Sequence, residues 1–89
     1  MTMRLRTIQW DLDAWKDYLY WQANDKQRLK RINQLVKDIA RNPAEGIGKP
    51  EKLKGNLAGF YSRRIDDEHR LVYAVDEKAV YIIACKGHY

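Results

Sequence analysis

The sequence has little cysteine and histidine and no long apolar segment. Cys85 is the single cysteine, so no disulfide can form within the chain, which fits a reducing compartment. One cysteine and two histidines match no zinc-ligand spacing, and we expect no metal or other cofactor. No run approaches the roughly 18 apolar residues of a membrane-spanning helix, and the first residues turn acidic before a signal peptide could develop. We therefore expect a soluble cytoplasmic protein without a membrane partner.

What the chain does contain is aromatic area and positive charge. Its 89 residues predict one domain, 1–89, and three Trp with six Tyr supply large apolar surfaces for a small core. The net charge of +5 indicates a polyanionic partner, most often a nucleic acid. The alternative is that the charge serves solubility alone.

Hydrophobic spacing predicts two helices after a short first strand. Apolar residues recur at helical intervals after Asp11 and again after Asp25, and both aspartates suit the N-cap position. Pro43 ends the second helix at Asn42. The expected elements are a strand at 5–10, helices at 12–24 and from Asp25 to Asn42, a loop at 43–59, and strands at 60–65, 69–75 and 79–86.

The order of these elements predicts an α+β fold. Short polar links at 66–68 and 76–78 join the last three strands as hairpins. The first strand and this three-stranded meander should form a mostly antiparallel sheet, with the two N-terminal helices packed on one face.

Three-residue hairpin loops predict a register. Arg64 then lies opposite Arg70, and Val75 opposite Ala79, so that Arg70 also lies opposite Ala84. Alternation divides the side chains between two faces. One face carries Arg64, Arg70, Ala84, Lys86 and His88, and the helix-covered face carries Leu71, Tyr73, Val75, Tyr81, Ile83 and Cys85.

Two opposed arginines repel each other unless an anion lies between them. Phosphate fits the planar fork of a guanidinium group, and a histidine beside it can transfer a proton near neutral pH. The alternative is that each arginine pairs with Asp66, Asp67 or Glu68 in the adjacent turn.

The preceding loop adds a carboxylate and further cations, because Glu51, Lys52 and Lys54 come just before the arginine strand. Metal-free RNA cleavage needs a carboxylate, fixed cations and an imidazole, since one oxygen loses a proton as another gains one.

Several other residues have plain structural interpretations. His69 should face the helices and be structural, and Cys85 should be an inert core residue. Trp15, Tyr18 and Trp21 form a helical stripe that belongs either to the core or to a subunit interface. The basic face of the second helix is either solvated charge or part of an RNA footprint.

Three stretches resemble a known family. "WKDYLYW", "GIGKPEKLKGNLAGFYSRRIDDEHRLVYAV" and the terminal "HY" are similar to the YoeB toxins of bacterial toxin–antitoxin modules, within the RelE-like group of small ribonucleases. The match runs from about Trp10 to Tyr89, and residues 1–5 look like an extension. The resemblance implies a microbial-RNase-like fold and a metal-independent, ribosome-dependent endoribonuclease that cuts messenger RNA in the decoding site and inhibits translation. It also implies a YefM-like antitoxin, acidic and partly disordered, and leaves a homodimer open.

The resemblance also implies roles for individual residues. Glu51 matches the general base and His88 the general acid, and Arg70 and Tyr89 complete the catalytic set. The loop lysine matches Lys54 and the second phosphate-facing arginine matches Arg64. The sequence departs from the family's pattern at Lys52, where a proline is frequent, and at Gly87, where a bulkier residue is frequent.

Other functions remain open. A RelE-like fold can serve as a binding module, or as a toxin with a non-RNA target such as gyrase, and a degenerate toxin binds only its antitoxin. Such relatives need not keep Glu51, Arg70 and His88 together.

Overall fold

The computed structural model describes residues 6–87; the predicted extension at 1–5 and the candidate residues His88 and Tyr89 lie outside the described residues. The elements are β1 (Thr7–Trp10), α1 (Leu12–Asn24), α2 (Lys26–Arg41), β2 (Glu51–Lys52), the 3₁₀ helix η1 (Gly55–Leu57), β3 (Tyr61–Arg64), β4 (Arg70–Val75) and β5 (Ala79–Ala84).

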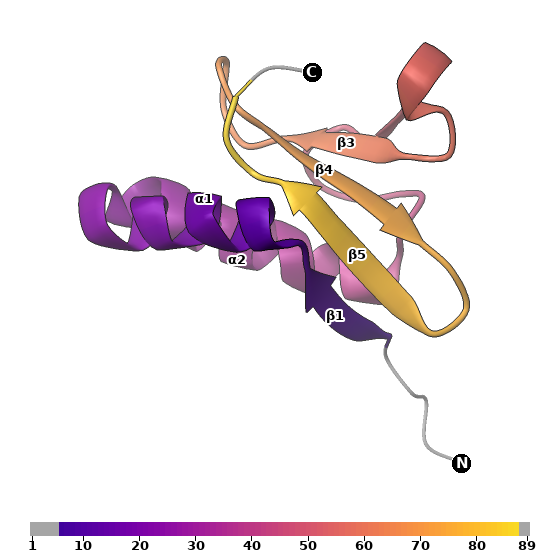
Figure 1. The fold of residues 1–89 in the computed structure, drawn as a ribbon, viewed down its shortest axis with the longest axis horizontal. Coiled ribbons are helices and arrows are strands. Elements are labelled where there is room, and N and C mark those ends of the chain that lie inside the picture. Colours follow the sequence, from indigo (N-terminus) through magenta and orange to yellow (C-terminus); the bar gives the residue numbers. More distant parts are fainter. Residues whose placement is uncertain (1–5, 88–89) are drawn as a thin grey trace.

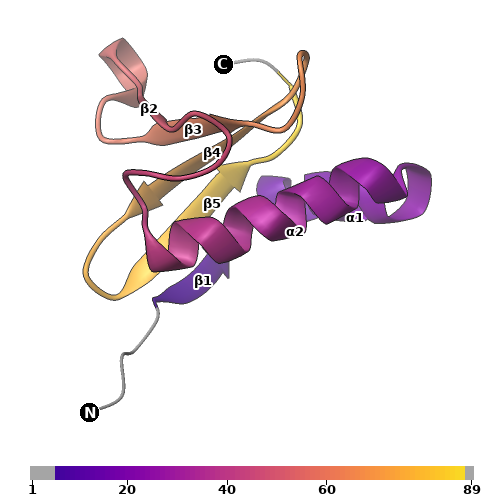
Figure 2. The same cartoon turned by 180° about the vertical axis from the view of Figure 1, so that it is seen from behind.

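The strands form one sheet in the order β1-β5-β4-β3-β2. β1 runs parallel to β5, and all other neighbours are antiparallel. Both helices cover the same face of this sheet, α2 alongside α1 (Figures 1 and 2). The predicted α+β architecture is confirmed. None of the described helices is long and apolar enough to span a membrane.

One strand falls inside the predicted loop. Glu51 and Lys52 of β2 pair with Ser62 and Tyr61 of β3. Two exposed charged residues show no alternation between apolar and polar positions, so periodicity could not reveal this strand.

The two helix starts behave differently. Asp25 caps α2 as predicted, because its carboxylate accepts a hydrogen bond from the Arg28 backbone N–H at 3.1 Å. Asp11 occupies the N-cap position of α1, but its side chain makes no capping bond. α2 ends at Arg41, and Asn42 is its C-cap residue.

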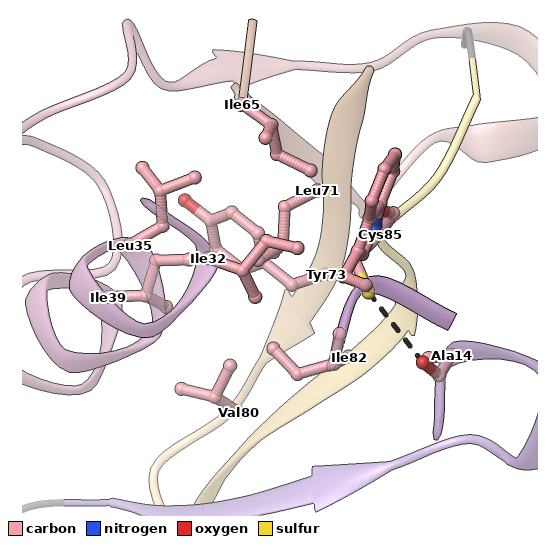
Figure 3. Close-up of a cluster of buried hydrophobic side chains, with 11 residues drawn as sticks. Ala14, Ile32, Leu35, Ile39, Ile65, Leu71, Tyr73, Val80, Ile82 and Cys85 are labelled. Carbon is pink, nitrogen blue, oxygen red and sulfur yellow. Dashed lines mark hydrogen bonds between the residues drawn. The ribbon is translucent and has the colours of Figure 1, made fainter. Parts of the chain in front are cut away.

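The core lies between the two helices and the sheet (Figure 3). Trp21 belongs to it with 4% exposure, whereas Trp15 on the same helix is 41% exposed and stacks on Tyr18 with ring centroids 5.5 Å apart. The aromatic stripe therefore divides between core and surface. The buried cluster comprises Ala14, Trp21, Ile32, Leu35, Ile39, Ile65, Leu71, Tyr73, Val80, Ile82 and Cys85.

The register of the β4–β5 hairpin differs from the prediction. Val75 lies opposite Val80 rather than Ala79, so Val80 and Ile82 enter the core where Tyr81 and Ile83 were expected. The cause is the turn, where the Asp76 carboxylate accepts the backbone N–H groups of residues 78 and 79 and lengthens the loop.

An irregularity further along β5 shifts the register again. Val72 lies opposite Ala84, so Ala84 shares the outer face with Arg70, and Cys85 returns to the core as predicted. The prediction that Arg70 lies opposite Ala84 is wrong. Its backbone N–H instead donates to the Gly87 carbonyl at 2.9 Å, three residues further along the chain. A β-bulge of this kind leaves no mark in the alternation of residue types.

Candidate functional site

The outer face of the sheet brings charged side chains of three strands together. Arg64 lies opposite Arg70 in the β3–β4 ladder, as predicted. Glu51 of β2 lies opposite Ser62 of β3, two residues before Arg64 and so on the same face. The pairing of β2 with β3 therefore places Glu51, which sequence reasoning could assign only to a loop, beside the arginine pair.

Arg70 is the centre of this group. Its Nη1 lies 3.4 Å from the Glu51 carboxylate and donates to Ser62 Oγ at 3.1 Å. The Arg70 side chain is 24% exposed and that of Glu51 is 61% exposed, so both reach solvent. The contact between them is long for a charge-assisted hydrogen bond, which commonly measures about 2.7–2.9 Å.

Arg64 pairs with an acidic residue of the adjacent turn, which was the alternative to phosphate binding. Its guanidinium donates to the Asp67 carboxylate at 2.9 Å, and the Asp67 side chain is almost fully exposed. Solvent-exposed ion pairs of this kind are weak, so an incoming anion can displace Asp67 from Arg64. Arg70, in contrast, pairs across the sheet with Glu51 rather than with an acid of the turn.

In the described part of the chain, neither Lys54 nor Lys86 makes a hydrogen bond or an ion pair with Arg70 or Glu51. Lys54 is exposed at the start of η1, three residues after Glu51. Lys86 was predicted to share the arginine face, which is wrong: its Nζ lies 4.0 Å above the ring of Tyr20 on α1. The reason is that β5 ends at Ala84, so strand alternation no longer applies at residue 86.

The site includes Ser62, which sequence reasoning missed. Its side chain is fully buried, and its hydroxyl accepts the hydrogen bond from Arg70. The predicted register already placed residue 62 on the arginine face, so alternation was the available signal. The hydroxyl helps to fix the direction of the Arg70 guanidinium.

A second missed residue, Arg63, lies behind the site on the helix-covered face. Its side chain is fully buried and pairs with Asp38 of α2 at 2.6 Å. The hydrogen bond from this guanidinium lowers the pKa of the Asp38 carboxyl, and burial raises the pKa of the Tyr73 hydroxyl. The other acceptors of Arg63 are the Tyr73 hydroxyl and the carbonyls of Asn42, Glu45 and Ile47.

Arg63 thereby fixes the segment that leads from α2 to β2. Gly46 passes so close to Asp38 that a Cβ atom at residue 46 would lie 1.9 Å from a carboxylate oxygen. The Gly48 carbonyl accepts the Arg64 N–H at 2.7 Å, which joins this segment to β3 just before Glu51. The buried cation is therefore part of what positions the candidate base.

Within residues 6–87, no group of three or more His, Cys, Asp or Glu side chains is arranged to hold a metal ion. The described residues provide a solvent-accessible carboxylate, Glu51, in contact with the Arg70 guanidinium, and a second arginine, Arg64, on the same sheet face. Such a set can accept a proton at the carboxylate and bind a phosphate through the arginines.

The fold has relatives of low sequence identity. YafQ from E. coli shares 19% identity over 93% of each chain, with a TM-score of 0.71. At this identity the likeness concerns the fold alone, an α+β domain with two helices on one face of the sheet.

Relatives of higher identity assign the family. A family model described as the YoeB-like toxin of bacterial type II toxin–antitoxin systems matches residues 10–89. Toxin YoeB of Escherichia coli strain K12 is 59% identical over 80 residues, 90% of this chain and 95% of that protein. The YoeB dimer from Staphylococcus aureus is 56% identical, covers 97% of this chain and 100% of its own, and superposes with a TM-score of 0.90. The chain belongs to the YoeB-like toxins of type II toxin–antitoxin systems, which confirms the resemblance found in the sequence.

Proposed function

We propose that this toxin is a ribosome-dependent endoribonuclease that cleaves messenger RNA in the decoding site, without a metal ion, and so inhibits translation in the cytoplasm. The observation that carries the proposal is the contact of Arg70 with Glu51 on an open sheet face, beside Arg64. A base and a phosphate-binding pair are thus adjacent and accessible.

The proposed reaction is an attack of the RNA 2′-hydroxyl on the adjacent phosphorus. Glu51 accepts the proton of that hydroxyl as the new P–O bond forms. The bond from phosphorus to the 5′-oxygen breaks, and His88 donates a proton to the leaving oxygen, which yields a 2′,3′-cyclic phosphate and a 5′-hydroxyl. General acid and base groups each contribute about 10²- to 10⁴-fold.

The arginines stabilise the charge that gathers on the phosphate oxygens. Arg70 can give up its long contact with Glu51 for a contact with the phosphate, while its hydrogen bond to Ser62 is kept. Arg64 exchanges Asp67 for the substrate, and Lys54 adds positive charge from the loop. Tyr89 steadies the RNA by stacking or through its hydroxyl.

The ribosome enters the proposal because the catalytic set is sparse. Positioning a substrate supplies a large part of a rate enhancement, and these few groups need one held in place. The outer surface of α2 carries four exposed cations that suit ribosomal RNA, and a net charge of +5 favours that approach. They are Lys26, Lys30, Lys37 and Arg41.

Two protein partners belong to the same proposal. The Staphylococcus aureus relative has been solved as a dimer and as a YoeB–YefM complex, the latter 57% identical to this chain with a TM-score of 0.87. We expect this toxin likewise to bind a YefM-like antitoxin, acidic and partly disordered, which folds over the cationic site. Exposed Trp15 and Leu19 on α1 offer apolar area for a homodimer.

The proposal is tested with purified translating ribosomes and a defined messenger. Glu51→Gln and His88→Ala should each lower the cleavage rate at least about 100-fold while the melting temperature stays close to that of the wild type. Glu77→Gln is the matched control, because this exposed carboxylate lies in the turn between β4 and β5. Wild-type rates for both site variants would reject the mechanism, and an uncut messenger with the wild-type toxin would favour a binding module.

A further inference from the structure

The residues that follow β5 are held mainly by side chains of other elements, with one backbone hydrogen bond to β4 at Gly87. The Cys85 N–H donates to the Asp17 carboxylate at 3.1 Å, and the Cys85 carbonyl accepts from Trp21 Nε1 at 2.8 Å. Two residues on, the Gly87 N–H donates to His69 Nδ1 at 2.9 Å. The backbone is therefore anchored up to the last described residue.

Gly87 is anchored on both sides. Its N–H binds the His69 imidazole, and its carbonyl accepts the Arg70 N–H at 2.9 Å. Its φ of +100° lies in a region that glycine adopts readily, so the chain leaves strand geometry here. The peptide group after Gly87 is planar, so an anchored Gly87 carbonyl restricts where the next residue can begin.

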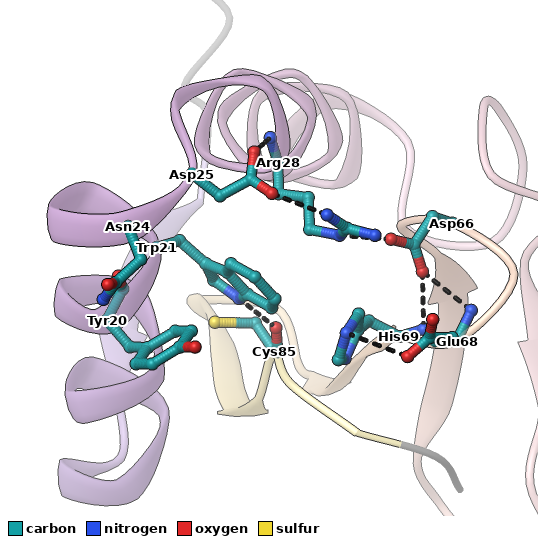
Figure 4. A network of polar contacts seen from close by, with 9 residues as sticks. All are labelled: Tyr20, Trp21, Asn24, Asp25, Arg28, Asp66, Glu68, His69 and Cys85. Carbon is teal, nitrogen blue, oxygen red and sulfur yellow. Dashed lines mark hydrogen bonds and ion pairs between the residues drawn. The ribbon is translucent and has the colours of Figure 1, made fainter.

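His69 is itself fixed by packing and hydrogen bonds (Figure 4). Its ring meets Trp21 edge to face with centroids 4.8 Å apart, and its backbone N–H donates to the Asp66 carboxylate at 2.7 Å. Asp66 is held in turn by an ion pair with Arg28, which also pairs with Asp25. A core-facing histidine thus presents a fixed acceptor nitrogen to the chain end.

We propose that His69 is a positioning residue for the reaction: its neutral imidazole, protonated at Nε2, accepts the Gly87 hydrogen bond through Nδ1 and so sets where His88 begins. The inference rests on the proposed function, in which His88 is the general acid. A displacement of about 1 Å at a reacting group can lower a rate by about 100-fold. His69 acts through Gly87 and does not touch the RNA.

If the role of His69 were purely structural, the cleavage rate would fall only as far as the stability falls. Two substitutions distinguish this from a positioning role. His69→Phe keeps an aromatic ring against Trp21 but has no acceptor. His69→Asn loses the ring, but its amide oxygen takes the place of Nδ1 and can still accept from Gly87. The melting temperature should therefore depend on whether the aromatic ring is kept, whereas the cleavage rate should depend on whether the hydrogen-bond acceptor is kept.

The experiment measures single-turnover cleavage of ribosome-bound messenger, the melting temperature and the hydrogen exchange of the Gly87 amide by NMR. We expect His69→Phe to lower the maximal rate about 10- to 100-fold with little change in apparent affinity, and to lose protection of that amide. His69→Asn should melt at a lower temperature but keep its rate within about threefold of wild type and keep the amide protected. Rates that follow the melting temperature, or full activity in His69→Phe, would overturn the inference.

The amide measurement separates this inference from the proposed function. If the wild-type toxin cuts no messenger, the proposed function fails, but the Gly87 amide still reports whether His69 anchors the chain end. Unchanged protection in His69→Phe overturns the anchoring even when the toxin is active.

Discussion

Replacing Arg63 with methionine should remove much of the protein's stability. The Arg63 side chain is fully buried and donates five hydrogen bonds, one of them to the Asp38 carboxylate. Methionine has a similar length and fills the apolar part of the site, but it donates nothing. Arg63→Met therefore leaves a carboxylate, a hydroxyl and three backbone carbonyls without their donor.

The expected cost follows from these unpaired groups. The Asp38 side chain is 29% exposed and so partly solvated, but a buried acceptor left without its donor costs about 1–3 kcal/mol, and the five acceptors of Arg63 together should cost at least about 3 kcal/mol. A domain of this size has a total stability of about 5–15 kcal/mol, and each kcal/mol shifts its melting temperature by about 4–8 °C. The melting temperature of Arg63→Met should thus fall by at least about 12 °C, measured by circular dichroism or calorimetry.

Arg64→Met is the matched control, because it makes the same substitution at the next residue of β3. The Arg64 side chain is 40% exposed and its one ion pair among the described residues is with exposed Asp67, so its loss should change the melting temperature by little. Equal melting temperatures for the two variants would refute the view that Arg63 anchors the segment before β2.

Three further outcomes are expected. The Arg63 hydrogen bond lowers the pKa of Asp38, so this pair stabilises the fold fully above the unfolded value of about 3.9 and loses that contribution as the pH falls through the lower folded pKa. Urea unfolding should therefore show a shallower loss of stability below about pH 4 for Asp38→Asn than for the wild type, and parallel curves would contradict this. Deleting Tyr89 should cut the cleavage rate sharply with little change in melting temperature, and a fully active deletion variant would remove Tyr89 from the catalytic set. Adding a YefM-like antitoxin should abolish cleavage, which a bound but fully active toxin would disprove.

The sequence predicted the register of the β3–β4 hairpin correctly, because the short polar link between the two strands fixes how they pair. That register placed Arg64 opposite Arg70 and His69 toward the helices, where it packs on Trp21. Local rules suffice wherever one face is buried and the connecting loop is short.

The β4–β5 register and strand β2 could not be predicted, because they depend on contacts that the local pattern of residue types does not reveal. A turn built on the Asp76 carboxylate and a bulge in β5 changed the register, and β2 is too short to show a period. Arg63 carried a weaker signal, because alternation puts it on the helix-covered face. A buried arginine becomes understandable only when all of its distant acceptors are known.

The most direct test of the proposed reaction compares one messenger in two states, naked and bound to translating ribosomes, with the same concentration of toxin. We expect cuts within the codon held in the decoding site, products with 2′,3′-cyclic phosphate and 5′-hydroxyl ends, and at least about 100-fold slower cleavage of the naked messenger. Equal rates on both forms, or 5′-phosphate ends, would contradict it.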